Sequence, residues 1–509
     1  MLIANRGEIA VRVIRACRDL GLPAVAVYSD CDRAARHVRM ADEAVAIGRN
    51  PAVESYLRID AIIDAARTSG ADAIHPGYGF LAENEMFAAA CREAGLTFIG
   101  PSAEAITLMG SKTAARRTAV AAGVTVVPGT TEPLGADVSL DRIEATAREI
   151  GYPIMIKAVA GGGGKGMRVV ERASDLASAV RAARSEAAAA FGDASIYLER
   201  RLERPRHIEV QILADHHGRV LPFVERECSV QRRHQKVIEE SPSPAVTPAL
   251  RARLADAAAA VAASAGYTNA GTIEFLLDED GSFYFLEMNT RIQVEHPVTE
   301  MVTGVDLVQW QIRIAAGEPL TLDPKAVLSP VGHAVECRIY AEDPDAGFLP
   351  SPGRITSLRA PSGPGIRDDG WVEEGTEVPT FYDSLLSKLI AWGVDREDAI
   401  ARMRRALAEY EVGGIQTTVP FFHWMLGEPA FLEGRVHTGF LDEVLQQRRA
   451  GFGAEAALSL VEVASVVACV ARTARAGTVE SATSRRPSIG PAPVGRSWKQ
   501  QGRVEGLRS

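Results

Sequence analysis

Residues 285–295 read Phe-Leu-Glu-Met-Asn-Thr-Arg-Ile-Gln-Val-Glu, a run in which every second position from 287 onward is polar. Alternate side chains of an extended strand lie on one face, so this run predicts a polar face backed by an apolar one. Together the polar groups could hold a metal ion, an anion and a proton. They are Glu287, Asn289, Arg291, Gln293 and Glu295.

The residues before this run complete a predicted β-hairpin. Residues 271–277 are β-branched and apolar, and 278–281 (Asp-Glu-Asp-Gly) form a turn signal. If position 277 pairs with 282, Glu274 is a diagonal neighbour of Glu287 at roughly 7 to 8 Å, within reach of one bridging cation. Glu274, Glu287 and Asn289 would then form an all-oxygen ligand set, which suits Mg²⁺ or Mn²⁺ bound to substrate phosphates. A sheet face that merely meets water has the same pattern, and the pairing alone leaves both interpretations open.

A glycine-rich segment lies earlier in the chain, at 160–166 (Ala-Gly-Gly-Gly-Gly-Lys-Gly), between predicted strands at 152–158 and 167–170. Adjacent glycines let backbone N–H groups approach phosphate oxygens, and Lys157 and Lys165 would add positive charge. The segment matches neither GxxxxGK[ST] nor GxGxxG, and a glycine run is equally typical of a linker or turn. The flanking lysines favour a phosphate-binding flap.

Several motifs, in a consistent order along the chain, resemble the biotin carboxylase component of biotin-dependent carboxylases, which are ATP-grasp enzymes. The resemblance covers about residues 1–446 and uses enough separate motifs to make chance a poor explanation. Besides the glycine-rich flap they are 3–10 (Ile-Ala-Asn-Arg-Gly-Glu-Ile-Ala), 75–81 (His-Pro-Gly-Tyr-Gly-Phe-Leu), 231–236 (Gln-Arg-Arg-His-Gln-Lys), 287–297 (Glu-Met-Asn-Thr-Arg-Ile-Gln-Val-Glu-His-Pro) and 333–338 (His-Ala-Val-Glu-Cys-Arg).

The expected fold class is α/β, with an α+β C-terminal part. A chain of 509 residues, 47% of them hydrophobic, suggests roughly three domains. Strands at 24–28, 71–75 and 97–99 alternate with helices at 59–68 and 87–94, which predicts a parallel, doubly wound sheet. Further helices are expected at 111–122, 175–190 and 396–411. The expected domains are an N-terminal pre-ATP-grasp domain at 1–110, a linker helix and glycine-flap lid at 111–200, an ATP-grasp core at 201–325, a C-terminal biotin carboxylase domain at 326–446, and a helical segment with a basic, disordered tail at 447–509.

Composition excludes several classes of protein. A net charge of -9 argues against a nucleic-acid partner. The six cysteines are scattered without a CxxC pair, which argues against a disulfide framework or zinc site and for a reducing compartment. No apolar run is long enough for a membrane helix, and Arg6 and Glu8 interrupt the N-terminal apolar stretch, unlike a signal peptide. We therefore expect a cytoplasmic protein with no membrane contact.

The resemblance implies a ligase that works in two steps. Bicarbonate attacks the γ-phosphate of ATP to give carboxyphosphate and ADP, and the carboxyl group then passes to the ureido nitrogen of biotin. This is the first half-reaction of an acyl-CoA carboxylase, of the acetyl- or propionyl-CoA α-subunit type found in fatty acid metabolism. The implied ligands are ATP, two Mg²⁺ or Mn²⁺ ions, and biotin as a substrate. The implied partners are a biotin carrier protein or domain, a second copy in a homodimer, and a carboxyltransferase β-subunit.

The resemblance also assigns roles to individual residues, and the chemistry of each side chain suits its role. A guanidinium fork clamps a planar anion, a carboxylate can take the bicarbonate proton, and a cation can stabilise the enolate of biotin. The implied metal ligands are Glu274, Glu287 and Asn289. The implied ATP-binding residues are Lys112, Lys157, Gly163, Gly164, Glu199, Leu202, His207, Gln231, His234, Glu274 and Glu287. The implied bicarbonate site is Lys236, Arg291, Gln293, Val294 and Glu295, with Glu295 as the general base, and the implied biotin site is Arg338 and Tyr78. The implied catalytic residues are Arg291, Glu295, Lys236 and Arg338.

Three interpretations of the function remain open from the sequence: a biotin carboxylase, another ATP-grasp ligase that joins a carboxylate to an amine, or a catalytically silent assembly subunit. Individual residues could also have a purely structural role instead of a catalytic one: Arg291 and Glu295 could form a surface ion pair, and Arg338 could be a structural cation. None of the ten methionines is followed by lysine, so the Met-Lys-Met biotinylation motif is absent. Either a separate carrier supplies biotin, or the chain is a shortened form of a longer α-subunit that has lost its carrier domain.

Overall fold

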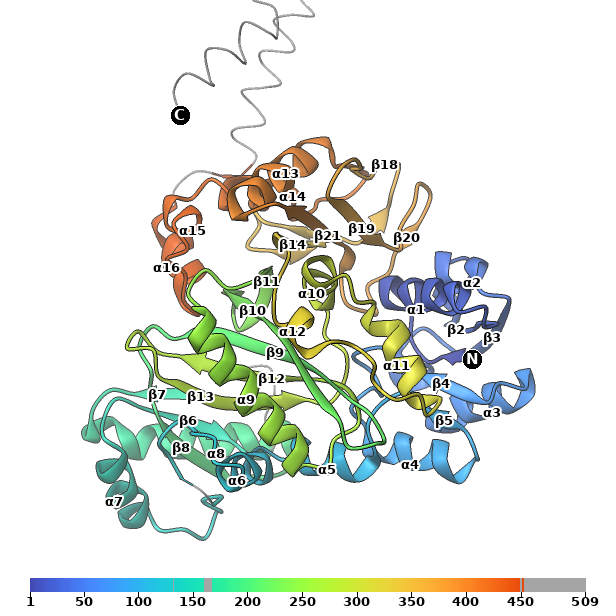
Figure 1. Cartoon of the computed structure of the whole chain (residues 1–509). Helices are drawn as coiled ribbons and strands as arrows, with labels where there is room; N and C mark the ends of the chain where they lie inside the picture. The colour runs from blue at the N-terminus through green and yellow to red at the C-terminus, as the bar shows by residue number, and fades with distance from the viewer. Residues whose placement is uncertain (131, 160–166, 449–450, 453–509) are drawn as a thin grey trace, which may run out of the picture. The chain divides into compact units, whose positions relative to one another are not determined.

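The computed structural model describes residues 1–130, 132–159, 167–448 and 451–452, and Figure 1 shows their arrangement. By internal contacts the chain divides into a unit at Met1–Phe452 and a unit at Gly453–Ser509. The glycine-rich segment with Gly163, Gly164 and Lys165, and the helix and tail expected beyond 452, lie outside the described residues. Among the described residues no helix is long and apolar enough to cross a membrane.

The N-terminal part is a parallel five-stranded sheet in the order β3-β2-β1-β4-β5, as expected for a doubly wound fold. The strand order reverses at β1, because β2 and β3 lie on one side of it and β4 and β5 on the other. The loops after β1 and β4 therefore border the crevice where such sheets bind ligands. Asn5 joins the two loops, because its Nδ2 donates to the carbonyls of Pro76 and Tyr78, each at 2.7 Å. The elements are β1 (Leu2–Ile3), α1 (Gly7–Asp19), β2 (Val25–Ser29), α2 (Arg36–Met40), β3 (Glu43–Gly48), α3 (Ile59–Ser69), β4 (Ala73–His75), α4 (Glu85–Glu93) and β5 (Thr97–Phe98).

A small three-stranded sheet, in the order β7-β6-β8, follows two linking helices. Side chains of these strands and of two helices form a separate apolar core, which includes Ile143, Ile154, Ile156, Val180 and Leu198. The elements are α5 (Ala103–Gly110), α6 (Lys112–Ala121), α7 (Leu140–Ile150), β6 (Ile154–Ala158), β7 (Arg168–Val170), α8 (Leu176–Phe191) and β8 (Ile196–Arg200).

The largest element is an antiparallel eight-stranded sheet in the order β13-β12-β9-β10-β11-β14-β21-β19. In Figure 1, α9 lies across the strands β9 and β12. The strands are β9 (Arg206–Ala214), β10 (Val220–Arg232), β11 (Gln235–Ser241), β12 (Asn269–Leu277), β13 (Phe283–Asn289), β14 (His333–Tyr340), β19 (Ile366–Gly370) and β21 (Leu385–Gly393). The helices around them are α9 (Pro248–Ser264), α10 (His296–Thr303), α11 (Leu307–Ala315), α12 (Pro324–Val327), α13 (Arg396–Glu409), α14 (Val419–Met425), α15 (Pro429–Leu432) and α16 (Phe440–Gln447).

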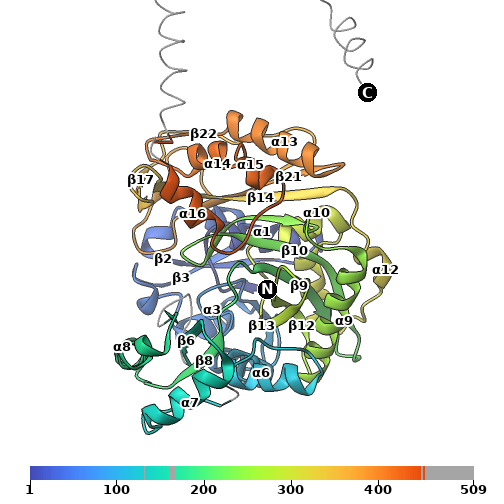
Figure 2. The same ribbon diagram turned by 90° about the vertical axis from the view of Figure 1, so that its left-hand side faces the viewer.

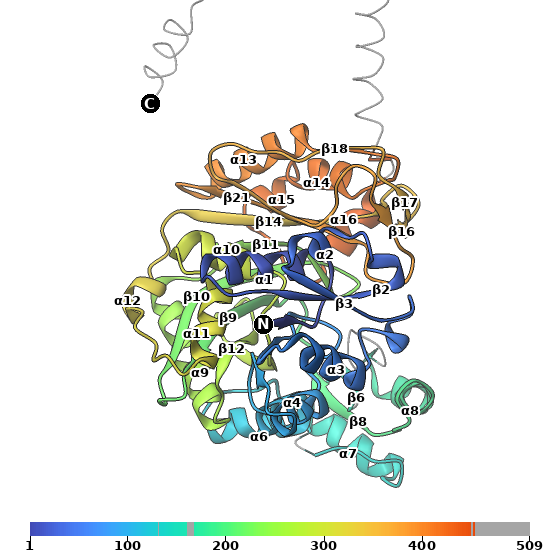
Figure 3. The same cartoon turned by 90° about the vertical axis from the view of Figure 1, so that its right-hand side faces the viewer.

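The two faces of this sheet differ in chemistry. One face is apolar: α6 and α9 pack on Ile208 and Ile273 at one end, and α13 and α14 pack on Val335 and Leu389 at the other. Figures 2 and 3 show α13 and α14 on one side of β14 and the N-terminal helix α1 on the other. Because strand side chains alternate, the charged residues of the same strands lie on the opposite face, toward the interior of the unit.

The remaining short strands belong to the C-terminal part and form two-stranded pairs. They are β15 (Glu342–Asp343), β16 (Leu349–Pro350), β17 (Gly353–Arg354), β18 (Ser357–Arg359), β20 (Glu377–Val378) and β22 (Glu411–Gly413). Apart from the strand that contains Glu287, the helices and strands expected within the described residues occur with ends displaced by at most two positions.

Two details of the expected hairpin are wrong. Leu277 pairs with Phe283 and not with position 282, and a bulge between Glu274 and Phe275 shifts the register again. Glu274 is therefore directly opposite Glu287, closer than the diagonal arrangement expected from the sequence. The strand also ends at Asn289, and Glu295 is the N-cap residue of α10 rather than part of an extended strand.

Candidate active site

A cavity of about 590 Å³ lies between the three-stranded sheet and the charged face of the eight-stranded sheet. Every candidate residue within the described part of the chain lines it, except Tyr78. These lining residues are Lys112, Lys157, Glu199, Leu202, His207, Gln231, His234, Lys236, Glu274, Glu287, Asn289, Arg291, Gln293, Val294, Glu295 and Arg338. Residues separated by more than 200 positions in the sequence thus converge on one space.

Strand pairing produces a row of charges across the sheet. Glu287 faces Glu274, Glu274 faces Glu209, and Glu209 faces Arg226, on four adjacent strands. Facing residues project from the same side, so these side chains are neighbours. Glu209 and Arg226 are fully buried. Their hydrogen bond, together with bonds from Arg226 to Gln211, Thr272 and Thr299, satisfies a guanidinium that has no access to water.

Lys236 lines this cavity and lies among three carboxylates. Its Nζ lies 2.5 Å from Glu209 Oε2, 2.8 Å from Glu274 Oε1 and 2.7 Å from Glu295 Oε1. Burial opposes the charged form, but the three carboxylates outweigh it and raise the pKa of Lys236 well above its ordinary value. Although burial again acts in the opposite direction, Lys236 lowers the pKa of both Glu274 and Glu295. The cluster therefore favours the charged forms of Lys236, Glu274 and Glu295 at neutral pH.

Glu274, Glu287 and Asn289 lie together at one end of the cavity. Burial and the facing Glu274 raise the pKa of Glu287, because two adjacent carboxylates repel each other. A divalent cation would relieve this repulsion, and the oxygen-rich donor set fits Mg²⁺ or Mn²⁺. Asn289 directs its Nδ2 to Glu274 Oε1 at 2.9 Å, while its Oδ1 accepts from Arg291 at 3.1 Å. The donor atoms of His207, Glu209 and Glu274 also lie within 4.8 Å of one another, a second group able to hold a cation.

The part of the cavity next to these ligands carries cationic and polar side chains from the three-stranded sheet and the β10–β11 turn. Lys157 Nζ lies 2.5 Å from Glu199 Oε2, and Arg116 also pairs with Glu199, so this carboxylate is fixed between two cations. Burial lowers the pKa of Lys112. Gln231 Nε2 lies 2.8 Å from His207 Nδ1 and donates to the Cys228 carbonyl. His234 is in the turn with a positive φ of 66°.

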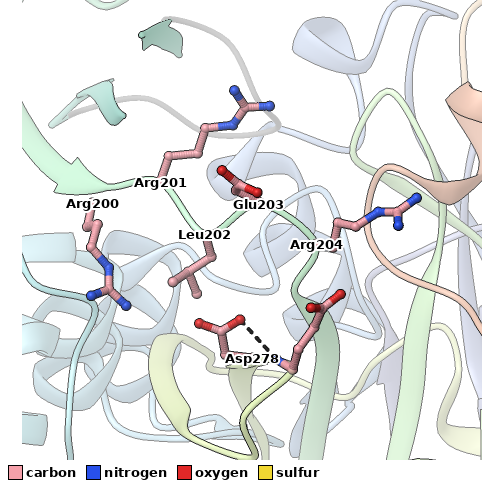
Figure 4. Close-up of a pocket in the computed structure, with 7 residues that line it drawn as sticks. Arg200, Arg201, Leu202, Glu203, Arg204 and Asp278 are labelled. Atoms are coloured by element: carbon pink, nitrogen blue, oxygen red, sulfur yellow. Dashed lines mark hydrogen bonds between the residues drawn. The ribbon is translucent and has the colours of Figure 1, made fainter. Parts of the chain in front are cut away.

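A smaller cavity of about 240 Å³ adjoins the segment after β8 (Figure 4). Arg200 and Arg201 extend in opposite directions from the chain, and Leu202 lines both this cavity and the larger one. On the far side, Asp278 of the β12–β13 turn accepts from the backbone N–H of Glu279 at 2.9 Å. Leu202 therefore lies where a ligand held by the segment 199–202 would enter the main cavity.

The segment 290–295 brings the remaining candidates together although it is not a strand. Arg291 donates to Glu83 at 2.9 Å and to Gln293 Oε1 at 2.7 Å, and Gln293 donates to Glu274 at 3.1 Å. Glu295, fully buried, accepts from Lys236 and from Arg338 Nη2 at 3.0 Å. The surface ion pair between Arg291 and Glu295 that the sequence left open is therefore wrong, since each residue has other partners and faces the cavity.

A second cavity, of about 550 Å³, holds Tyr78 and adjoins the first at Arg291, Val294 and Arg338. Its walls come from the loops after β1 and β4, from β14, and from the segments after β19 and before β21. They carry several aromatic rings, among them Tyr78, Phe80, Trp371, Phe381 and Tyr382. The Tyr78 hydroxyl donates to Glu8. Arg338 reaches this junction from β14, held by Glu239 at 2.6 Å and by Glu295.

Several residues of the site were not predicted from the sequence. Glu209 could have been found, because His207, Glu209 and Gln211 alternate on β9 in the same way as the residues after 285. Glu83, Glu239 and Lys388 carry no comparable local signal. Each reaches the site only through contacts between segments far apart in the chain.

An ATP-grasp ligase is the class of protein that this fold and site define, and comparison with known proteins agrees. Three family models match: "Biotin carboxylase, N-terminal domain" over residues 1–106, "Carbamoyl-phosphate synthase L chain, ATP binding domain" over 111–323, and "Biotin carboxylase C-terminal domain" over 336–443. The biotin carboxylase of Nostoc sp. is 54% identical over 449 residues, 87% of this chain and 98% of that protein. A pyruvate carboxylase subunit from Methanothermobacter thermautotrophicus is 53% identical over 443 residues, 87% of this chain and 89% of that protein.

Solved structures give the same result. A biotin carboxylase from Campylobacter jejuni in a β-γ-ATP complex superposes with a TM-score of 0.83 at 46% identity, covering 87% of this chain and 98% of that one. The biotin carboxylase domain of 2-oxoglutarate carboxylase from Hydrogenobacter thermophilus, with MgADP, ADP and bicarbonate, has a TM-score of 0.83 at 48% identity and covers 87% and 96%. The chain belongs to the biotin carboxylase family: it is an ATP-dependent ligase that carboxylates biotin.

Proposed function

We propose that this chain carries out the first half-reaction of a biotin-dependent acyl-CoA carboxylase, on biotin presented by a carrier protein or domain. The observation that carries the proposal is the position of Lys236. A single buried ammonium bonds Glu274, beside the expected metal and phosphates, and Glu295, beside the expected bicarbonate. This arrangement supports binding of the phosphoryl acceptor next to the phosphates, as transfer between the two requires.

At the phosphate end, we assign Glu274, Glu287 and Asn289 as the residues that would hold two Mg²⁺ or Mn²⁺ ions. A bound metal would neutralise the negative charge that develops on the phosphates during transfer. Lys112, Lys157 and His207 bring positive charge or donors to the same space. The segment 199–202 would hold the adenine through its backbone, next to the side chain of Leu202.

At the other end, Arg291 is proposed to clamp bicarbonate through paired donors, with Gln293, Lys236 and the Val294 N–H beside it. Glu295 takes the bicarbonate proton, since it is held among cations that keep it ionised. Arg338 stands at the junction with the second cavity, where it would stabilise negative charge on the ureido oxygen of biotin. Tyr78 lines that second cavity, which suits the apolar ring and side chain of biotin.

Several finer points extend this proposal. Biotin comes from a separate carrier or from a carrier domain of a longer α-subunit, and a carboxyltransferase β-subunit completes the reaction. The relatives include the alpha subunit of a methylcrotonoyl-CoA carboxylase from rice, at 51% identity, as well as the pyruvate carboxylase subunit, so the final acceptor depends on the transferase. The homodimer, the domain limits expected from the sequence and the cytoplasmic location are part of the same proposal.

The test is ATP hydrolysis by the purified full-length chain with Mg²⁺. We expect ADP formation that depends on bicarbonate and accelerates with free biotin. ATP turnover indifferent to bicarbonate, or stimulated by an amine and another carboxylate, would instead support a different ATP-grasp ligase. An absence of turnover by a folded, nucleotide-binding chain would support an assembly subunit. Addition of a transferase with acetyl-CoA, propionyl-CoA or pyruvate then identifies the acceptor.

A further inference from the structure

Two buried side chains hold consecutive backbone carbonyls of the segment 293–295 from behind the cavity. His296 Nδ1 lies 2.7 Å from the carbonyl oxygen of Gln293. Lys388 Nζ donates to the carbonyl oxygen of Val294 at 3.1 Å. Both side chains have no exposed surface. A fully buried lysine or histidine is costly unless it has hydrogen-bond partners. The two bonds to this segment therefore satisfy a requirement of the fold.

The contacts of His296 define its hydrogen-bonding state. A carbonyl oxygen only accepts, so Nδ1 carries the proton and Nε2 is bare. Burial and the nearby cations Lys388, Arg12 and Arg367 lower the pKa of His296 well below its ordinary value, which keeps the ring neutral. Its Nε2 has no hydrogen-bond partner among the described residues. The one strong bond of this ring is therefore the bond to Gln293.

Lys388 lies on the charged face of the sheet, on β21, the strand next to the edge strand β19. Its Nζ lies 3.1 Å from Glu8 Oε2, and its neighbours across the strands are Arg338 on β14 and Asp369 on β19. Glu8 also accepts the hydroxyl proton of Tyr78. Lys388 thereby links the segment at Val294 to the loop that carries Tyr78, so that one side chain contacts the walls of both cavities.

The contact between His296 and the Gln293 carbonyl also sets the direction of the next backbone N–H, that of Val294. The carbonyl of Gln293 and the N–H of Val294 belong to the same planar peptide unit and point in opposite directions. A carbonyl bound to His296 behind the segment therefore directs the Val294 N–H away from α10, and Val294 lines both cavities. Among the described residues this N–H has no acceptor. An unpaired backbone donor at a cavity wall is ready to bind an anion.

We propose that His296 and Lys388 are positioning residues for the bicarbonate subsite: they hold the peptide units at 293–295 so that the Val294 N–H and the Glu295 carboxylate face the bound anion. This inference rests on the proposed function, because it takes bicarbonate to bind at Arg291 and Val294. Neither residue touches a substrate. Their removal should therefore change the affinity for bicarbonate while leaving ATP binding intact.

The test uses the full-length chain and compares KM for bicarbonate with KM for ATP in the biotin-stimulated ATPase assay. His296→Leu removes the donor at similar volume, whereas His296→Asn places an amide N–H near the position of Nδ1. Lys388→Met removes the ammonium and keeps the stem, and Lys388→Met with Glu8→Gln avoids leaving Glu8 without its partner. The matched controls are His37→Leu, a buried histidine beside the Val27 carbonyl, and Lys325→Met, an exposed lysine.

We expect His296→Leu and Lys388→Met to raise KM for bicarbonate about tenfold or more, with KM for ATP within about twofold of wild type. His296→Asn should recover much of the bicarbonate affinity, and the controls should match wild type. Wild-type KM for bicarbonate in both variants, or an equal rise in both KM values, would overturn the inference while leaving the proposed function intact. If His296→Leu does not fold, the same decision rests on the Lys388→Met, Glu8→Gln double variant. A wild-type chain without bicarbonate-dependent turnover would refute the proposed function itself, and this inference with it.

Discussion

Replacement of Glu295 by glutamine tests the proposed general base with little change of shape. Glu295 is fully buried, 2.7 Å from Lys236 Nζ and 3.0 Å from Arg338 Nη2. Glutamine keeps one of the two oxygens that accept these bonds, replaces the other with an amide NH₂ group, and cannot take a proton. A positioned general base contributes about 10² to 10⁴ in rate, so kcat should fall by that factor. At about 1.36 kcal/mol per tenfold, this corresponds to a barrier higher by roughly 3 to 5 kcal/mol.

The effect of the same change on stability should be much smaller. Lys236 retains Glu209 and Glu274, and Arg338 retains Glu239, so no buried cation loses its last carboxylate. We expect a loss of about 1.5 to 3 kcal/mol, the range for weakened hydrogen bonds to charged groups, below the roughly 3 to 5 kcal/mol that follows from an unpaired buried charge. KM for ATP should stay near the wild-type value, because the metal-side residues are unchanged.

The assay is biotin-stimulated, bicarbonate-dependent ADP release, with urea unfolding measured on the same preparations. Glu318→Gln, an exposed glutamate on the segment after α11, is the matched control and should behave as wild type. A Glu295→Gln variant that folds and keeps kcat within about threefold of wild type would refute the assignment of Glu295 as base, because that factor lies far below the range for general bases.

Three further predictions concern other parts of the site. Arg226→Met should destabilise the chain by about 3 to 5 kcal/mol in urea unfolding, because Glu209 loses its buried guanidinium partner; a loss below about 1 kcal/mol would contradict this energetic role. Burial raises the pKa of Glu8 to about 7 from 4.5, so the folded state binds an extra proton between these values. Glu8 should therefore contribute a fall in stability of at most about 3 kcal/mol as pH rises from about 5 to 7. The fall should be smaller by that amount in Glu8→Gln, and an unchanged slope in that variant would exclude Glu8 as a source. Glu287→Gln should increase the Mg²⁺ concentration needed for half-maximal ATP turnover by roughly tenfold or more, whereas Glu279→Gln in the exposed hairpin turn should not, and equal Mg²⁺ titrations would argue against Glu287 as a ligand.

Local patterns in the sequence were sufficient for most of the secondary structure and for the polar residues of the hairpin, whereas most of the other residues that line the cavity were expected only from the resemblance to biotin carboxylases. Alternation along 271–277 and 285–289 predicts both hairpin strands and places Glu274 and Glu287 on one face, as the structure has them. Helices at 59–68 and 111–122 were likewise expected from their periodicity. These features follow from the backbone alone, because the period of a strand or helix sets the direction in which each side chain points.

The register of the hairpin and the course of the chain after Asn289 could not be predicted in this way. A bulge between Glu274 and Phe275 brings the two carboxylates directly opposite each other, and a turn into α10 carries Glu295 to the cavity. Both depend on how the hairpin packs against β9 and on the neighbours of α10. A strand continued through Glu295 satisfies the local pattern equally well, so the local pattern cannot distinguish the two.

The sequence by itself determined which chemical groups this protein has and which face of each strand they occupy. Only the tertiary structure decided their partners: Arg291 bonds Glu83 across 208 positions, and Lys388 joins Glu8 to the Val294 carbonyl. The physical reason is that the pKa and orientation of a buried charge depend on its nearest opposite charges and on the exclusion of water. Segments distant in sequence supply both, and they meet only when the chain has folded.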